Sequence, residues 1–178
     1  MHAQILYGSR YGASRRYAEA FSQMTGIPVS DCASIPDLTG CDLVLHFGGL
    51  YAGGVAGLQA TLRALPETAR LVIATVGLAD VRDPENVRNI RSALARQVPR
   101  QILDRAAVFH LRGAIDYGEL KWKHRAMMTL LYQKAKRIPR DRQTPEVRAM
   151  LETFGSRVDF VDTGSLTPLL EVLPPQDR

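Results

Sequence analysis

A short loop near the start of the chain has the residue types of an anion-binding site. It follows an apolar run at 3–7, precedes a helical pattern, and consists of Ser9, Arg10, Tyr11, Gly12, Ala13 and Ser14. Backbone N–H groups, two hydroxyls and the positive end of the following helix would together hold a phosphate. The loop lacks the Gly-Lys-Ser/Thr of a Walker loop and the glycine triad of dinucleotide-binding proteins. Taken alone, it is equally typical of a Gly/Ser turn that caps a helix.

Two further loops follow later apolar runs. One consists of Gly48, Gly49, Leu50, Tyr51, Ala52 and Gly53, and the other contributes Thr75, Val76, Gly77, Leu78 and Asp80. Glycine lets backbone approach a ligand closely, and a flat ring such as Tyr51 can stack on a planar ligand. The alternative is that the glycines only turn the chain and Tyr51 covers the next helix. Asp80 equally fits a solvated carboxylate ahead of a helix.

Apolar runs and helical patterns alternate along most of the chain. Strands are expected at 3–7, 27–29, 42–47, 71–75 and 107–111, and helices at 14–24, 55–65 and from Pro84 to before Pro99. Such alternation is typical of an α/β fold with a doubly wound parallel sheet and right-handed crossovers. Ligands of these sheets bind beyond the carboxyl ends of the strands, so the three loops are expected to form one site.

The alternation ends after the fifth strand. A basic helix is expected at about 120–137, a second helix from Thr144, a strand at 158–161 and a last helix at 166–173. We interpret residues 113–157 as a basic helical insertion in the last strand region of a single domain, 1–178. From Lys121 to Arg148 there are nine Lys/Arg against two acidic residues, so this segment accounts for the net charge of +5.

The basic segment suggests an anionic partner. A carboxylate-bearing substrate, an acidic protein and the anionic surface of a membrane would each fit, and a merely solvated face is the alternative. Its apolar residues at helical spacing are expected to pack against the domain, namely Met127, Leu130, Leu131 and Ile138. No nucleic-acid recognition module accompanies the charge, so no nucleic-acid partner is expected. The sequence predicts no particular oligomeric state.

The remaining chemistry-bearing residues exclude other kinds of site. Cys32 and Cys41 are too few for a disulfide scaffold, and the four histidines lack metal-ligand spacing, so reduced thiols and no metal are expected. His46 and His110 fall inside apolar strands and are interpreted as core histidines. A basic leader is missing, as is an apolar run of about 20 residues, which favours a cytoplasmic protein with at most peripheral membrane contact.

In order and spacing, these segments resemble the flavodoxin family. Ser9, Gly12 and Ser14 match the key positions of its phosphate loop, with Ser14 in place of the commoner Thr. The resemblance is closer to flavodoxin-domain proteins related to menaquinone-dependent protoporphyrinogen oxidase. It is carried by the loop around Tyr51, by residues 76–79, and by Gly113-Ala114 followed by Tyr117 and Trp122. It implies a flavodoxin-like five-stranded parallel sheet of order 2-1-3-4-5 and noncovalently bound FMN.

The same resemblance implies an FMN-dependent oxidoreductase that passes electrons from an organic donor to a quinone-type acceptor. No side chain is nominated as its acid or base. Contacts with a substrate or a membrane surface would come from Arg112, Lys121, Lys123 and Arg125. The alternative is a non-enzymatic, flavodoxin-type FMN electron-transfer protein that docks onto a redox partner through the insertion. Simple carriers of this kind are expected to be acidic, so the basic insertion favours the enzyme.

Overall fold

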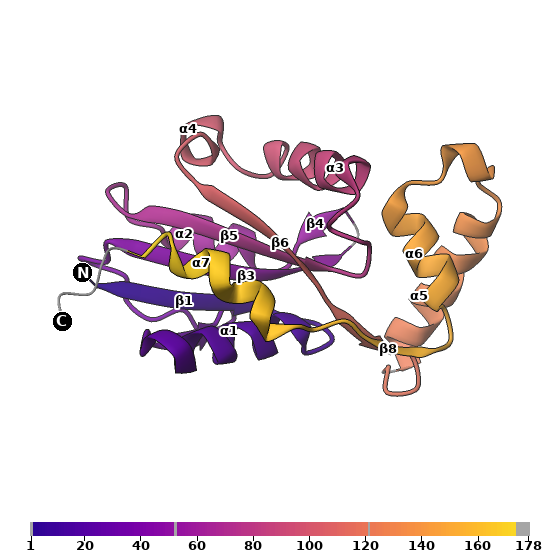
Figure 1. Cartoon of the computed structure of the whole chain (residues 1–178), viewed down its shortest axis with the longest axis horizontal. Helices are drawn as coiled ribbons and strands as arrows, with labels where there is room; N and C mark the ends of the chain where they lie inside the picture. The colour runs from indigo at the N-terminus through magenta and orange to yellow at the C-terminus, as the bar shows by residue number, and fades with distance from the viewer. Residues whose placement is uncertain (1, 52, 121, 174–178) are drawn as a thin grey trace.

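Five parallel strands form the central sheet of the computed structural model, which describes residues 2–51, 53–120 and 122–173. Their spatial order is β2-β1-β3-β5-β6. Their bounds are β1 (Ala3–Gly8), β2 (Val29–Asp31), β3 (Leu43–Tyr51), β5 (Arg70–Gly77) and β6 (Ala107–Arg112). Counted among parallel strands alone, this is the order 2-1-3-4-5, so the predicted flavodoxin-like doubly wound sheet is confirmed (Figure 1).

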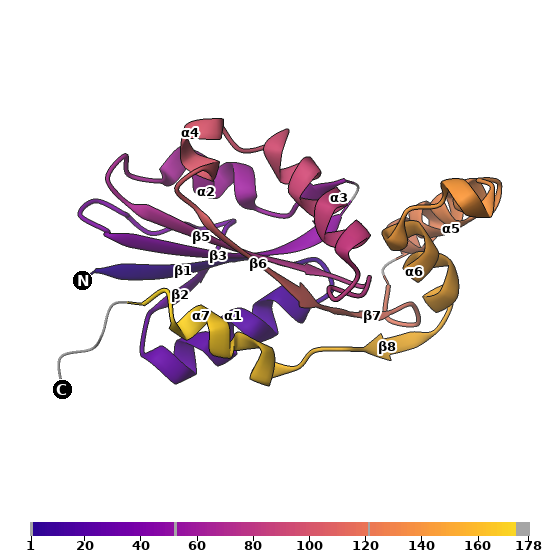
Figure 2. The same ribbon diagram turned by 45° about the horizontal axis from the view of Figure 1, so that its top comes forward.

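Helices cover both faces of the sheet (Figure 2). One face carries α1 (Ala13–Thr25), the 3-10 turn η2 (Thr163–Leu166) and α7 (Thr167–Leu170), and the other carries α2 (Leu58–Ala64), α3 (Pro84–Ala95) and α4 (Arg100–Leu103). Ile5 and Leu45 pack toward α1, whereas Leu6 and Val44 pack toward α2 and α3. Because both faces are buried, the strands are continuous apolar runs in the sequence.

The second loop region differs from its prediction. β3 continues to Tyr51 and pairs antiparallel with a two-residue strand, β4 (Gly54–Val55). The helix predicted at 55–65 therefore begins only at Leu58, and its predicted start was wrong. Gly53 and Gly57 have φ values of 78° and 77°, the left-handed backbone that lets the chain turn before and after β4.

The insertion extends beyond the carboxyl ends of the strands (Figure 1). At its base, β7 (Ala114–Asp116) pairs antiparallel with β8 (Arg157–Asp159). Between these strands lie α5 (Trp122–Lys136), the 3-10 turn η1 (Arg140–Arg142) and α6 (Pro145–Thr153). The strand predicted at 158–161 is thus shorter and belongs to this separate ribbon, not to the central sheet, because its partner is β7.

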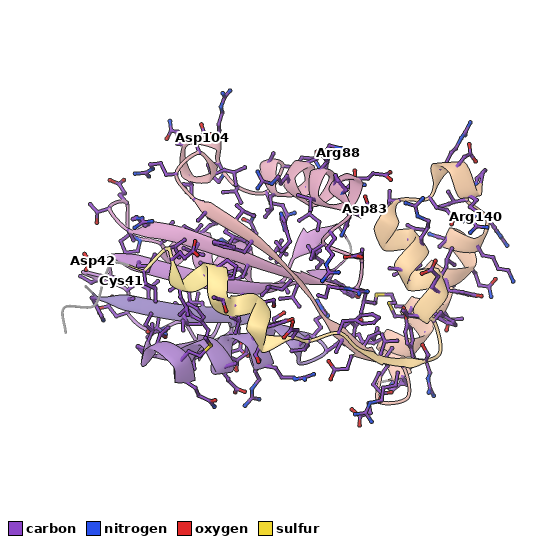
Figure 3. The ribbon with its side chains drawn as sticks, in the orientation of Figure 1. Cys41, Asp42, Asp83, Arg88, Asp104 and Arg140 are labelled. Atoms are coloured by element: carbon purple, nitrogen blue, oxygen red, sulfur yellow. The ribbon has the colours of Figure 1, made fainter. Side chains whose placement is uncertain are left out.

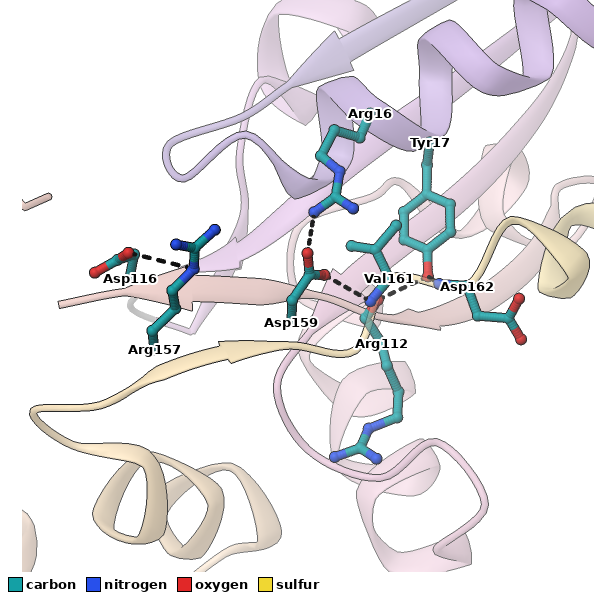
Figure 4. Close-up of polar contacts among 8 residues, drawn as sticks. All are labelled: Arg16, Tyr17, Arg112, Asp116, Arg157, Asp159, Val161 and Asp162. Carbon is teal, nitrogen blue, oxygen red and sulfur yellow. Dashed lines mark hydrogen bonds and ion pairs between the residues drawn. The ribbon is translucent and has the colours of Figure 1, made fainter. Parts of the chain in front are cut away.

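The base of the insertion is fixed to α1 (Figure 4). The Tyr17 hydroxyl donates to the Arg112 carbonyl oxygen at 2.8 Å and accepts the Asp162 N–H at 2.9 Å. Arg16 pairs with Asp159 at 2.7 Å. Both segments that enter and leave the insertion are therefore held by the helix that follows the first loop.

Candidate functional site

The carboxyl ends of β1, β3, β5 and β6 lie at one edge of the sheet (Figure 1). Gly48 pairs with Gly8 on one side and with Thr75 on the other. At the next strand, Gly77 pairs with Arg112. These registers place the three predicted loops next to one another, at the edge where doubly wound sheets bind ligands.

The first loop ends in a glycine turn at the start of α1. Gly12 has a φ of 88°, and its N–H donates to Ser9 Oγ at 3.0 Å, which closes the loop. α1 begins at Ala13 with no side-chain cap and no acidic residue in its first turn. The first N–H groups of a helix have no partner within the helix, and the positive end of its dipole lies there. An anion would satisfy both.

Ser14 adds a hydroxyl to this turn. The residue is 2% exposed, and its Oγ forms no hydrogen bond with any described residue. A Cβ atom at Gly49 would lie 3.2 Å from this Oγ, so glycine at position 49 keeps the space beside the hydroxyl open. Ser14 lines the cavity described below, where a ligand oxygen could be the partner of its hydroxyl.

A cavity of about 200 Å³ lies between the three loops and the insertion. The predicted site residues that line it are Ser9, Arg10, Tyr11, Ala13, Ser14, Gly49, Leu50, Tyr51, Val76, Gly77 and Leu78. Gly113, at the start of the insertion, lines it as well. The fold therefore brings residues of all three loops to one cavity.

Five other predicted site residues lie outside the wall of this cavity, namely Gly12, Gly48, Gly53, Thr75 and Asp80, and Ala52 falls outside the described residues. Gly48 serves packing, since a Cβ there would come 2.1 Å from Val55 Cγ1. The Thr75 hydroxyl lies 2.7 Å from His110 Nδ1. Asp80 Oδ1 accepts the Arg82 N–H at 2.9 Å and shapes the approach to α3. These residues position the loops.

The far wall of the cavity is apolar and comes from the insertion. Ile115, Met128, Leu131 and Met150 line it, and the sequence analysis did not include any of them among the site residues. Of these four residues, only Leu131 belongs to the apolar stripe of the basic helix, which was predicted to pack against the domain. For Leu130, Leu131 and Ile138 that packing prediction was wrong, because these side chains are 65%, 37% and 36% exposed.

Arg10 and Tyr51 reach from the loops to the insertion. Arg10 Cζ lies 4.3 Å from the centre of the Tyr51 ring, which is a cation–π contact. Arg10 Nη1 is 3.5 Å from His124 Nε2, and the Tyr51 hydroxyl donates to Met127 Sδ. The loops and α5 are therefore joined by the same two side chains that narrow the cavity.

Tyr11 contributes a neutral phenol to the cavity wall. Burial raises its pKa, and the neighbouring Tyr51 and Tyr117 phenols act in the same direction. The hydroxyl is buried and has no hydrogen-bond partner among the described residues. Because the raised pKa keeps the proton in place, Tyr11 is a hydrogen-bond donor and not a phenolate.

His46 is a core histidine, as predicted. Its Nδ1 lies 2.8 Å from Thr61 Oγ1 and its Nε2 lies 3.1 Å from the Ala56 carbonyl oxygen. Burial lowers the pKa of His46 to about 4. Burial, with a smaller contribution from Arg91, also lowers the pKa of His110 to about 4. Within the described parts of the chain, no group of His, Cys, Asp and Glu side chains could hold a metal ion.

The insertion carries exposed basic side chains, namely Lys134, Lys136, Arg137 and Arg140. Figure 3 shows Arg140 on the side facing away from the sheet. Arg112, by contrast, is half-buried and donates to the Leu78 carbonyl oxygen at 3.2 Å. A helix long and apolar enough to cross a bilayer does not occur among residues 2–51, 53–120 and 122–173.

Comparison with known proteins identifies the family of the chain. The family model described as "Flavodoxin domain" matches residues 4–141. Two single-residue variants of flavodoxin from Pseudomonas aeruginosa are similar structures, at 20% and 18% identity and a TM-score of 0.40 each. Each alignment covers 73% of this chain and 93% of the flavodoxin chain. No curated protein matches the chain. Since the family model covers most of the sequence, the chain belongs to the flavodoxin-domain family, and its cofactor is FMN.

Proposed function

We propose that the chain is an FMN-dependent oxidoreductase, similar to protoporphyrinogen oxidase, that passes electrons from an organic donor to a quinone-type acceptor. The observation that carries the proposal is the apolar wall of Ile115, Met128, Leu131 and Met150 opposite the loops. An electron carrier needs only an exposed ring edge, whereas an added apolar wall suits a flat apolar molecule. Bound FMN supplies the electron-transfer chemistry, and the protein binds and orients the reactants.

The residues of the cavity fit FMN. Ser9, Ser14 and the first N–H groups of α1 would hold its phosphate, as the unpartnered Ser14 hydroxyl suggests. The loop at Leu50 and Tyr51 and the loop at 76–78 would flank the ring. Main-chain groups of the second of these loops would meet the polar edge of the ring.

Binding would require Arg10 to move. The cavity of about 200 Å³ is smaller than the roughly 300–1,000 Å³ of typical ligand pockets. Arg10 is exposed and narrows the cavity by lying on the Tyr51 ring. Rotation toward the start of α1 would free that ring face and pair the guanidinium with the phosphate, a charge-assisted contact.

Quinone-dependent oxidation of protoporphyrinogen or a related donor by the FMN-loaded protein tests the proposal. Turnover should require FMN and a quinone, and it should fall at least tenfold in Met128→Lys, which puts a charge into the apolar wall. Thr129→Lys, on the exposed side of the same helix, is the matched control. A protein that binds FMN but oxidises none of these donors would contradict the enzymatic proposal.

The exposed basic side chains of the insertion favour a second candidate, an FMN electron-transfer protein that docks onto an acidic redox partner. Lys134, Lys136, Arg137 and Arg140 form no ion pair with a described residue, and so they are available to a partner. The apolar side chains of Trp122 and Leu130, 75% and 65% exposed, would let the same region lie on an anionic membrane surface.

The two candidate functions predict different responses to a small donor and to salt. A carrier should exchange electrons with a reductase, turn over no small donor by itself, and lose its partner affinity as salt rises. An enzyme should keep its turnover at high salt when the donor is supplied in solution. Adding anionic vesicles, with neutral vesicles as the control, separates membrane binding from protein docking.

A further inference from the structure

Arg112 is a half-buried cation behind the loop at 76–80. It is the last residue of β6 and pairs with Gly77. Its Nη2 donates to the Leu78 carbonyl oxygen at 3.2 Å, and its Cζ lies 3.7 Å from the centre of the Phe160 ring. Its Nε is buried without a hydrogen-bond partner among the described residues, and the side chain forms no ion pair with any of them.

This arrangement is costly unless an anion lies nearby. Removing a guanidinium from water without a counter-charge costs free energy, which a paired anion offsets. The neighbouring cations are paired, Arg16 with Asp159 and Arg157 with Asp116. Figure 4 shows the Arg112 side chain turned away from both pairs. Phe160 makes a cation–π contact with the guanidinium and the Leu78 carbonyl oxygen accepts one hydrogen bond from it, but neither supplies a counter-charge, so the positive charge points to an anionic ligand.

We propose that Arg112 stabilises the negative charge that reduction places on the FMN ring, and so raises the reduction potential of the bound cofactor. The inference rests on the proposed function, because it takes the loop at 76–80 as the one at the polar edge of the ring. Two-electron reduction with uptake of one proton adds one negative charge to the ring of FMN. Leu78 lines the cavity, and its carbonyl oxygen is bound by the guanidinium. Charges interact strongly across such a partly desolvated layer.

Arg112 does not line the cavity, and so it is not a catalytic residue but a positioning residue, which would act on the ring only through its charge and through the loop at 76–80. Its test is the midpoint potential of FMN together with the affinity for oxidised FMN. Arg112→Gln removes the charge, and Arg112→Lys retains it while losing the flat contact with Phe160. Arg82→Gln is the matched control, because Arg82 follows the same loop but is exposed to water.

In Arg112→Gln, the affinity for reduced FMN should fall at least tenfold relative to the affinity for oxidised FMN. This corresponds to a midpoint potential that is lower by about 30 mV for a two-electron couple. Arg112→Lys and Arg82→Gln should change this ratio by less than threefold. The effect should persist at high salt, since a half-buried charge is poorly screened.

An unchanged potential in an Arg112→Gln protein that binds oxidised FMN normally would overturn the inference. An equal shift of the midpoint potential in Arg82→Gln would also overturn it. So would a tenfold change, in Arg112→Lys, of the ratio of the affinities for reduced and oxidised FMN. This second result decides the matter if Arg112→Gln does not fold. A higher KM for a carboxylate-bearing donor without a change in potential would assign the charge to the substrate instead. Failure of the wild-type protein to bind oxidised FMN would contradict the proposed function, and with it this inference.

Discussion

Ser14 is a buried residue whose hydroxyl forms no hydrogen bond with any described residue and which lines the cavity. In Ser14→Ala, the affinity for FMN should fall about tenfold, because one hydrogen bond to a charged group contributes roughly 1.5–3 kcal/mol. The affinity for riboflavin, which lacks the phosphate, should stay the same. Titration of flavin fluorescence measures both constants, and Ser34→Ala in an exposed turn is the control. An equal loss for both ligands would place the hydroxyl at another part of the flavin.

His46 should make the stability of the protein depend on pH. Burial lowers its pKa from 6.5 to about 4, so the unfolded chain takes up a proton more readily than the folded one. The contribution of the neutral imidazole is therefore complete above pH 6.5 and is lost as pH falls toward 4, by roughly 3 kcal/mol in all.

Urea unfolding at several pH values measures this loss. His46→Gln should be less stable than the wild type above pH 6.5, and the difference should shrink as pH falls toward 4, because glutamine does not titrate. A difference between the two proteins that stays constant with pH would contradict the buried, neutral state of His46.

Residue types predicted the loops of the site but not every side chain that forms it. Ser9, Tyr51 and Leu78 line the cavity as expected, whereas Gly48 and Thr75 lie inside β3 and β5, before these strands end. Successive residues of a strand point to opposite faces, so the point at which a strand ends decides which side chains reach a ligand. Met128 comes from a helix whose packing depends on the whole fold, and sequence spacing alone does not show which surface its side chain contacts.

Among the elements, α1 supports both sides of the site. Its first turn follows the first loop and includes Ser14, and Tyr17 in its second turn holds the segments that enter and leave the insertion. Tyr17→Phe should lower the free energy of unfolding by about 1–3 kcal/mol, since the Arg112 carbonyl and the Asp162 N–H lose a buried partner. Urea titration measures the change. Tyr132→Phe is the control, because the Tyr132 hydroxyl bonds no described residue. An equal loss of unfolding free energy in the two variants would argue against the role of Tyr17 in holding the insertion.

Periodicity predicted the central strands and α1 well, because long apolar runs and a 3.6-residue repeat are strong signals. It misplaced the start of α2, since Val55 was counted with the helix although it belongs to the two-residue strand β4. Residues 158–161 were correctly seen as extended at their start, yet β8 pairs with β7 outside the central sheet. A short run shows that a strand forms but not which strand pairs with it.

At the scale of the whole molecule, the insertion begins and ends on one ribbon. Asp116 lies opposite Arg157, and the Tyr117 N–H donates to the Ser156 carbonyl oxygen at 3.3 Å. Residues 118–155 can therefore be replaced by Asn-Gly, a two-residue turn that joins antiparallel strands. Ile115→Thr and Tyr117→Thr would be added, because both side chains pack under the insertion.

The shortened protein should fold and bind FMN with at most about a tenfold loss of affinity, because the loop from Ser9 to Ser14, proposed to hold the phosphate, stays intact. Quinone-dependent turnover should disappear, because the apolar wall is gone. Flavin fluorescence measures FMN binding and a steady-state assay measures turnover. The control is the full-length double variant that carries both Ile115→Thr and Tyr117→Thr. Full turnover without the insertion would contradict its assignment to the substrate.

Trp122 gives the site an optical reporter of its own. It is the single tryptophan of the sequence, it is 75% exposed at the start of α5, and it precedes by two residues the histidine that contacts Arg10. Indole emission responds to water around the ring and passes energy to a flavin close by. Emission from the native protein can therefore follow cofactor loading and ligand entry in real time, with no label attached.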